Sequence, residues 1–343
     1  MLSDNSFVGS HWVNSYEVIN QANLVLDNAS EIDDATERAT VEGEALFLRA
    51  MTYFDMVRFY GGVPLRTAGV TNYGADLDIE RASADAIYAQ VASDLNDAYI
   101  KLPASNGEFA DKYAAKALLA RVHLQLGNYA EALTAANDVL ANSGHSLASS
   151  FARAFNNDSD SSEDIFAFQV TSQDGSNALV THYAAMVFGG RGGDIVVDTY
   201  RSLFDSALDV RRGFFYISPD SGAICTYKYT NEYGNVPTLR IGEMHLIRAE
   251  ANFRLGSSTG LAPLTEINAL RARSGAPALT ALSLDLIFNE RQLELGFEGH
   301  ILHDKKRFGK SILGLPSNSP KLVLPIPQSE MDSNSLMVQN SGY

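Results

Sequence analysis

The stretch from Glu44 to Leu65 constrains the fold more than any other part of the chain. Between Ala45 and Tyr60 it is apolar except at four positions, Arg49, Thr52, Asp55 and Arg58. A run that is apolar on nearly every side is typical of a buried helix, and its length and lack of alternation argue against a strand. The sequence Gly61-Gly62-Val63-Pro64 supplies the stop. We therefore predict a buried helix that is covered by other helices.

The bulk composition indicates an ordinary globular protein. The 343 residues are 45% hydrophobic and 20% charged, and no Pro/Ser-rich linker divides them, which favours one domain over residues 1–343. The formal net charge of −15 argues against nucleic acid and anionic membranes as partners, because both require a basic surface. Neutral or cationic ligands suit such a protein better.

Cysteine usage and hydropathy exclude several classes of protein. The single cysteine, Cys225, cannot form an intrachain disulfide, and a cysteine-based metal site is improbable. No stretch reaches the length of a membrane span. The first residues, MLSDNSFVGS, lack both the pattern of a signal peptide and a cysteine that could accept a lipid.

Helical periodicity recurs along both halves of the chain. Residues 11–29 have apolar side chains at helical spacing, and Ser83 is placed to cap a helix that ends before Pro103. Residues 112–141 have the spacing of a tetratricopeptide repeat, carried by Leu119, Ala120, Gly127, Tyr129 and Ala132. Such helix pairs cannot bury their apolar faces alone, so we predict an all-α superhelix of stacked pairs.

The middle of the chain breaks this pattern. Residues 142–240 are rich in Gly, Ser, Asp and Tyr, with strand-like runs at 164–170 and 223–229, and are predicted to form a loop-rich insertion lobe. Helices resume at 241–255, 262–273 and 283–298. The helical repeats are therefore predicted at about 11–141 and 241–310, and an extended tail at 311–343.

Three motifs resemble those of the SusD/RagB family. FLRAMTYFDMVRFYGGVPL closely resembles the signature helix of that family, and the tail PIPQSE…NSL…QNSGY resembles its closing motif. The family also has a W-x-x-x-Y-x-x-I-x-x-x-N helix, which Trp12, Tyr16, Ile19 and Asn23 match. The resemblance therefore runs from Trp12 to Tyr343, over essentially the whole chain.

The resemblance implies a function, a partner and a location. Members of the family are surface-exposed outer-membrane lipoproteins of Gram-negative bacteria that capture glycans or other nutrients and pass them to a TonB-dependent porin. It therefore implies a non-enzymatic protein without a cofactor, which binds an oligo- or polysaccharide beside a SusC-like porin. It also implies that the full-length protein has an export signal and a lipidated cysteine that this chain lacks.

A carboxylate-rich helix leaves two interpretations open. Glu290, Glu294 and Glu298 fall on one helix face, and His300 and His303 follow, so a metal hydrolase or di-iron site is possible on spacing alone. No His-Glu-x-x-His motif supports it. We favour an acidic helix face paired with nearby bases, namely Arg291, Lys305, Lys306 and Arg307. The segment also resembles a structural element of the family, but Ile301 stands where the family usually has Arg.

Three other polar segments have weaker chemical interpretations. Residues 156–164 alternate acidic and polar side chains but lack the glycine and final carboxylate of a calcium loop. The Gly-rich residues 189–194 have no phosphate-binding lysine and are predicted to form a lid or ligand loop. Three carboxylates could be a glycosidase pair, or else local caps and salt bridges: Asp198, Asp205 and Asp209. Asp209 and Arg211 match a D-x-R element of the family that has no catalytic role there.

Carbohydrate binding predicts aromatic platforms flanked by polar side chains, because sugars present apolar C–H faces and hydroxyl edges. Aromatic residues outside the predicted helices are the better candidates. Trp12 has two open interpretations, an anchor of the first helix or a platform for the ligand. The predicted ligand-binding residues are Trp12, Asn14, Tyr73, Tyr183, Phe188, Arg191, Tyr216 and Tyr233.

Three functions remain open at this point. Glycan capture is favoured, a helical-repeat scaffold for other proteins is the second possibility, and a glycoside hydrolase is the third. For glycan capture, the ligand site is expected where the insertion lobe meets the start of the first helix, not at the helix that contains Glu294.

Overall fold

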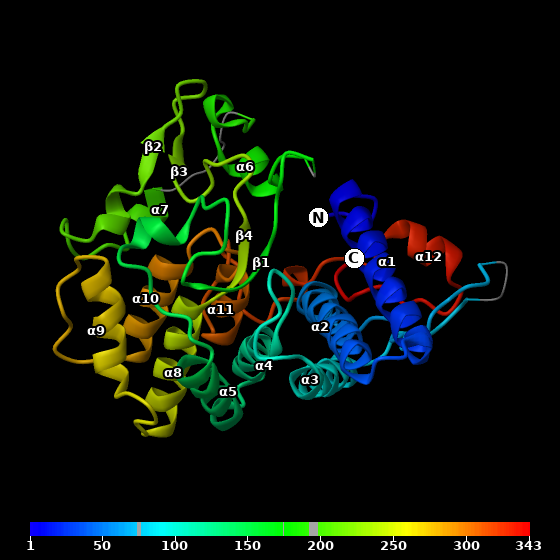
Figure 1. The fold of residues 1–343 in the computed structure, drawn as a ribbon. Helices are drawn as coiled ribbons and strands as arrows, with labels where there is room; N and C mark the ends of the chain where they lie inside the picture. Colours follow the sequence, from blue (N-terminus) through cyan, green and yellow to red (C-terminus); the bar gives the residue numbers. More distant parts are fainter. Residues whose placement is uncertain (74–76, 174, 192–197) are drawn as a thin grey trace. The chain divides into compact units, whose positions relative to one another are not determined.

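A computed structural model of the protein describes residues 1–73, 77–173, 175–191 and 198–343. The chain divides into two compact units, residues 1–122 with 305–343, and residues 123–304 (Figure 1). Both units are mainly helical, so the all-α prediction is confirmed. The prediction that the chain forms one single domain stays a prediction.

The first unit is built on three long helices, α1 (Ser6–Asn28), α2 (Ala35–Tyr60) and α3 (Ala84–Lys101). Each begins at a side chain that accepts hydrogen bonds from the free N–H groups of the first turn: Asn5, Asp34 and Ser83. A short helix, α12 (Gln328–Ser333), comes from the C-terminal tail, and α4 (Lys112–Leu126) runs across the boundary between the units.

Helix α2 is the core of the first unit, as its sequence predicts. It packs against both α1 and α3, and Phe47, Tyr53 and Tyr60 are fully buried. Its buried Arg49 donates two hydrogen bonds to Asp94 of α3, at 2.7 and 2.8 Å, and one to Asn23 of α1 at 2.8 Å. One polar residue of the apolar run thus joins the three helices, because a buried guanidinium must be paired.

The C-terminal tail completes the end of α2. Gly61 takes a positive φ of 74° there, and the last carbonyls of the helix have no partner within it. Leu324 N–H donates to the Phe59 carbonyl at 2.7 Å, and Asn340 Nδ2 donates to the Tyr60 carbonyl at 2.8 Å. The closing motif of the chain therefore caps its signature helix.

The second unit contains the other helical pairs. α5 (Tyr129–Asn142) packs against α8 (Ile241–Leu255), and α8 packs against α9 (Pro263–Arg273) and α10 (Leu284–Leu295). Leu246, Ile267 and Leu295 belong to the apolar core between them. Shorter helices are α6 (Ala178–Tyr183), α7 (Asp198–Arg201) and α11 (Ile301–Arg307), the last of which crosses the boundary between units.

Two small antiparallel sheets lie within the predicted insertion lobe. β1 (Asp164–Phe168) pairs with β4 (Val236–Arg240), and β2 (Phe215–Ile217) pairs with β3 (Ile224–Thr226). The two strand-like runs of the sequence, 164–170 and 223–229, are thus confirmed as strands, each shorter than predicted. Of the Gly-rich stretch 189–194, residues 192–194 lie outside the described residues.

The partners predicted for Glu290 and Glu294 of α10, and for Glu298 just after it, are wrong. The predicted acidic face is a buried cluster of ion pairs. Glu294 alone contacts three arginines, Arg211 at 3.4 Å, Arg240 at 3.3 Å and Arg273. These bases come from distant segments, not from the residues that follow the helix in sequence.

Other charged residues of the second unit join this cluster or lie at its edge. Asp209 caps the turn that follows it and binds Arg211 at 2.7 Å, which confirms its interpretation as a cap and salt bridge. Asp205 binds Arg271 at 2.9 Å. Burial lowers the pKa of Lys228 to about 8, although Glu298 beside it opposes that shift. The cluster is therefore balanced by many opposed charges in a dry interior, where removing one partner is costly.

Asp164 at the start of β1 gives the second unit a pH-dependent stability. The side chain is buried, Oδ2 accepts the Ser161 N–H at 2.7 Å, and Oδ1 has no hydrogen-bond partner among the described residues. Burial raises its pKa to about 6 from 3.8. A carboxyl group with a raised folded pKa stabilises fully below its unfolded pKa, and that contribution is lost as the pH rises through the folded pKa.

Asp164→Asn is therefore expected to become more stable relative to the wild type as the pH rises, by about 1 kcal/mol between about pH 5 and about pH 8. Urea unfolding at the two pH values measures the change. Asp97→Asn, an exposed change on α3, is the control. Parallel pH profiles for Asp164→Asn and the wild type would contradict the role given to this carboxyl group.

Candidate functional site

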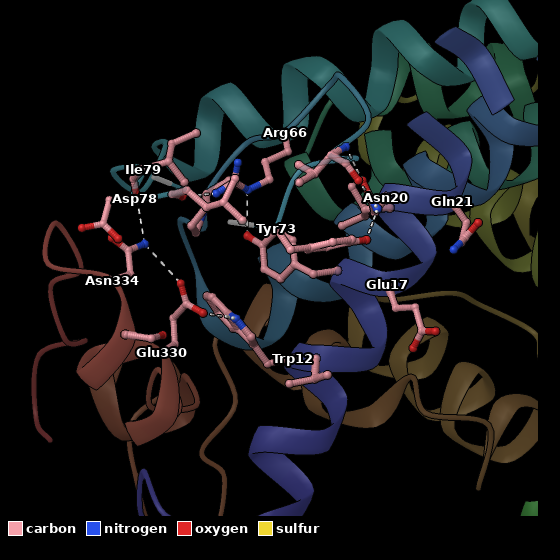
Figure 2. A pocket seen from close by; sticks show the side chains of 17 residues that line it. Trp12, Glu17, Asn20, Gln21, Arg66, Tyr73, Asp78, Ile79, Glu330 and Asn334 are labelled. Atoms are coloured by element: carbon pink, nitrogen blue, oxygen red, sulfur yellow. Dashed lines mark hydrogen bonds between the residues drawn. The ribbon is translucent and has the colours of Figure 1, made fainter. Parts of the chain in front are cut away.

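A cavity of about 610 Å³ opens in the first unit between α1, residues 64–73 and 77–79, and α12. It is called the α1–α12 cavity below. One wall is a face of α1, the second is the segment that follows the signature helix, and the third is α12 (Figure 2). Aromatic, apolar and polar side chains all line it: Trp12, Val13, Tyr16, Glu17, Ile19, Asn20, Gln21, Pro64, Arg66, Val70, Tyr73, Leu77, Asp78, Ile79, Glu330, Ser333 and Asn334.

The α1 wall combines a buried base with an accessible rim. Trp12 is only 2% exposed, its ring meets Tyr60 edge-on, and its Nε1 donates to Glu330 at 3.2 Å. Tyr16 donates its hydroxyl to the Pro64 carbonyl at 2.7 Å, and burial raises the pKa of this phenol well above its ordinary value. Both side chains are therefore fixed and uncharged at the base of the cavity.

Asn20 fixes the most exposed aromatic ring of the cavity. Its Oδ1 accepts the Val70 N–H at 2.7 Å, and its Nδ2 donates to the Tyr73 hydroxyl at 3.1 Å. The Tyr73 side chain is nonetheless 73% exposed. Figure 2 shows its ring within the cavity, with the hydroxyl turned toward Asn20. A ring held at one end with accessible faces is a preorganised surface for stacking.

Arg66 closes the segment that forms the second wall. Its guanidinium donates to the Leu77 carbonyl, and its backbone N–H donates to the Tyr53 hydroxyl at 2.7 Å. The two ends of residues 66–77 are thereby joined across the cavity wall. The same tyrosine donates back to the Arg66 carbonyl at 2.9 Å, so the segment is anchored on the buried signature helix.

Helix α12 is joined to the segment at residues 78–79. Asn334 Nδ2 donates to the Ile79 carbonyl at 3.0 Å and to Glu330 at 3.1 Å. Asp78 accepts the Ser335 N–H at 3.0 Å. The tail thus supplies the third wall by backbone and side-chain hydrogen bonds, and Glu330 is held between Trp12 and Asn334.

Two polar side chains on the rim are free to meet a ligand. Glu17 and Gln21 are exposed on α1, one turn apart, and neither makes a side-chain hydrogen bond or ion pair with another described residue. A carboxylate accepts hydrogen bonds and an amide both donates and accepts, which suits the hydroxyl edges of a sugar.

The structure brings together two of the predicted site residues in this cavity, Trp12 and Tyr73. Trp12 is buried and anchors α1, and it also forms part of the cavity base; its role as a platform for the ligand stays a prediction. Asn14 does not line the cavity. It is exposed on α1 two residues after Trp12, about 200° around the helix, whereas Tyr16 and Asn20 follow Trp12 at intervals of four.

The other predicted residues lie in the second unit. Phe188 and Tyr216 meet at 5.2 Å between ring centroids, Tyr216 meets Tyr227 at 4.8 Å, and Tyr183 packs against Tyr229 at 5.3 Å. Tyr233 is 40% exposed. Arg191 contacts His182 at 2.6 Å, at the edge of the described residues. Their role as ligand contacts stays a prediction.

Sequence reasoning missed most polar residues of the cavity. Asn20 could have been found, because it follows Trp12 and Tyr16 at intervals of four residues on one helix face. Glu330 belongs to the P-I-P-x-x-E motif, but its contact with Trp12 spans 318 positions, and one sequence does not show such a pairing.

Two structural properties bear on the other interpretations. Among the described residues, no three His, Cys, Asp or Glu side chains are grouped so that they could hold a metal ion. None of the helices described is both long and apolar enough to cross a membrane.

Comparisons with known proteins give consistent matches. Residues 2–124 match a family described as "Starch-binding associating with outer membrane", and residues 223–321 match the SusD family. Together these matches cover more than half of the chain. The chain is 26% identical to SusD-like protein P2 of Formosa agariphila, in an alignment covering 100% of this chain and 82% of that protein.

Solved structures share the fold. A laminarin-binding SusD-like protein superposes with a TM-score of 0.83 at 25% identity, over 97% of this chain and 86% of its own. A SusD superfamily protein of Parabacteroides distasonis superposes with a TM-score of 0.85 at 22% identity, over 100% of this chain and 87% of its own.

Proposed function

The chain belongs to the SusD/RagB family, and on that premise we propose that it captures an oligo- or polysaccharide without cleaving it. The observation that supports this most is Tyr73, an exposed ring that Asn20 holds in a cavity of about 610 Å³. Stacking on such a ring, with hydrogen bonds between the sugar hydroxyls and the side chains of Glu17 and Gln21, is a combination suited to a sugar.

Binding without cleavage is tested with a panel of polysaccharides in affinity gels, followed by an assay for reducing ends. We expect slowed migration in at least one polysaccharide gel and no release of reducing ends on long incubation. Reproducible release of sugar would contradict the proposal, because it would require catalytic groups. Unchanged migration throughout a broad panel would contradict glycan capture itself.

We also propose that the captured glycan is delivered to a TonB-dependent, SusC-like porin at the outer membrane. The support is family membership together with the description of the family that matches residues 2–124. In this proposal the full-length protein is anchored at the cell surface by a lipid. Co-purification of the full-length protein with a porin from its native outer membrane is the test, and recovery from the periplasm alone would contradict it.

Tyr73→Ala is expected to weaken glycan binding at least about tenfold while leaving the melting temperature nearly unchanged. The ring is 73% exposed, so its loss removes a stacking surface and little of the packed core. Calorimetric titration beside a melting curve measures both effects.

Phe109→Ala is the matched control, because that ring is 69% exposed in the same unit and does not line the cavity. Equal affinities for Tyr73→Ala and Phe109→Ala would remove the cavity from the binding site. Trp12→Ala is a poorer probe, because its ring is buried and its loss lowers stability as well as affinity.

The aromatic residues of the second unit remain proposed ligand contacts. Phe188, Tyr216 and Tyr233 are partly or largely accessible, and Tyr216 is held by the Ala185 N–H at 2.9 Å. Tyr183 and Arg191 of the same unit, and Asn14 on α1 of the first unit, also remain proposed ligand contacts.

A further inference from the structure

We propose that the α1–α12 cavity selects uncharged glycans and discriminates against those that carry carboxylate or sulfate groups. This inference rests on the proposed function and adds the chemical class of its ligand. Three carboxylates line the cavity, Glu17, Asp78 and Glu330, and Arg66 is the one basic side chain among the described lining residues.

Glu330 makes hydrogen bonds but no ion pair with the described residues. It accepts from the Trp12 indole at 3.2 Å and from the Asn334 amide at 3.1 Å, and both donors are neutral. Glu17 is exposed on the rim and has no ion pair with a described residue. A ligand in the cavity therefore meets negative charge at the base and at the mouth.

Arg66 is poorly placed to reverse this balance. Its guanidinium already donates to the Leu77 carbonyl, and it is only partly exposed. Its single positive charge, held at the wall by this hydrogen bond, stands against the carboxylates of Glu17 and Glu330. An anionic sugar would therefore bring a like charge into a recess where screening by water is reduced, which opposes binding.

The same carboxylates favour a neutral sugar. Each hydroxyl group of a sugar can donate a hydrogen bond to an ionised acceptor, and such bonds are stronger than neutral ones. Glu17 beside Gln21 offers both an ionised acceptor and an amide within one helical turn. The net charge of −15 adds a long-range field that slows the approach of polyanions.

The test compares one glycan in two charge states. The probe is a neutral polysaccharide that binds in the gel panel, and laminarin is tried first. Oxidation of its primary hydroxyl groups to carboxylates gives the charged form. Alginate and polygalacturonate are natural anionic probes. Calorimetric titration is made at low and at high salt, with the wild type, Glu17→Lys and a control, Asp97→Lys, which changes an exposed carboxylate outside the cavity.

We expect the wild type to bind the oxidised form at least about tenfold more weakly than the neutral form, with a smaller ratio at high salt. Glu17→Lys should reduce that ratio several-fold, and Asp97→Lys should leave it unchanged. Oxidation also removes a hydroxyl group, which could weaken binding by itself. Only charge repulsion between the protein and the oxidised glycan would weaken at high salt and respond to Glu17→Lys.

Each remaining outcome overturns a defined part of the account. Equal or tighter binding of the oxidised or natural anionic glycans overturns the selectivity and leaves glycan capture standing. Equal effects of Glu17→Lys and Asp97→Lys on the ratio of the two affinities overturn the assignment of the selectivity to the cavity. Absence of binding to every glycan overturns the inference and the proposed function together.

Discussion

Glu294→Ala is expected to lower the free energy of unfolding by about 3–5 kcal/mol. The side chain is fully buried and contacts three arginines of the second unit: Arg211, Arg240 and Arg273. Its removal would leave buried guanidinium groups close together without the carboxylate that pairs them. Removing one member of a buried ion-pair cluster can cost more free energy of unfolding than the intact cluster contributes, because the remaining charges stay buried without a partner.

Urea unfolding followed by circular dichroism measures this loss. Glu131→Ala is the matched control, since it removes an exposed carboxylate from α5 of the same unit and is expected to cost less than about 1 kcal/mol. A loss for Glu294→Ala as small as that of the control would show that the buried ion pairs do not hold the unit together.

The pKa of Glu294 gives the same cluster a predictable response to acid. Burial works to raise this pKa, but the guanidiniums of Arg273, Arg240 and Arg211 hold it well below its ordinary value. A depressed folded pKa contributes stability above the unfolded pKa, and that contribution is lost as the pH falls toward the folded pKa. The destabilisation by Glu294→Ala should therefore shrink on acidification below about pH 4.

Phe54→Ala is expected to destabilise the first unit by about 3–5 kcal/mol. The ring is 1% exposed, lies 4.2 Å from the Arg58 guanidinium carbon and meets Tyr88 edge-on at 6.2 Å between centroids. Its loss removes buried apolar surface and leaves a cavity between α2 and the side chains that pack against it. The fluorescence of Trp12, the single tryptophan of the chain, reports unfolding of this unit.

Phe109→Ala removes the same side chain from an exposed position in the first unit and serves as the control. A change of less than about 1 kcal/mol for Phe54→Ala would show that α2 is not the core described above.

The sequence predicted the core far better than the ion pairs. α2 could be predicted because a continuous apolar run, a glycine stop and a proline act locally. The partners of Glu294 could not, because proximity in sequence pointed to Lys305 and Arg307, whereas burial selects arginines from distant segments. In a dry interior, the pairing of charges is set by the tertiary fold and not by helix spacing.

The candidate site was predicted in part for a similar reason. Helical periodicity places Trp12, Tyr16 and Asn20 on one face, and Tyr73 was suggested by its position outside the helices. Glu330 reaches Trp12 only because the tail returns to the first unit, which a single sequence does not reveal. Asn14 was suggested by its closeness to Trp12 in sequence, but a separation of two residues turns it away from that face.

The most direct test of the account is a structure of the protein bound to a neutral oligosaccharide that it captures. We predict a sugar ring stacked on Tyr73 in the α1–α12 cavity, with its hydroxyls hydrogen-bonded to Glu17 or Gln21. A sugar bound elsewhere on the chain, with the α1–α12 cavity unoccupied, would contradict the account.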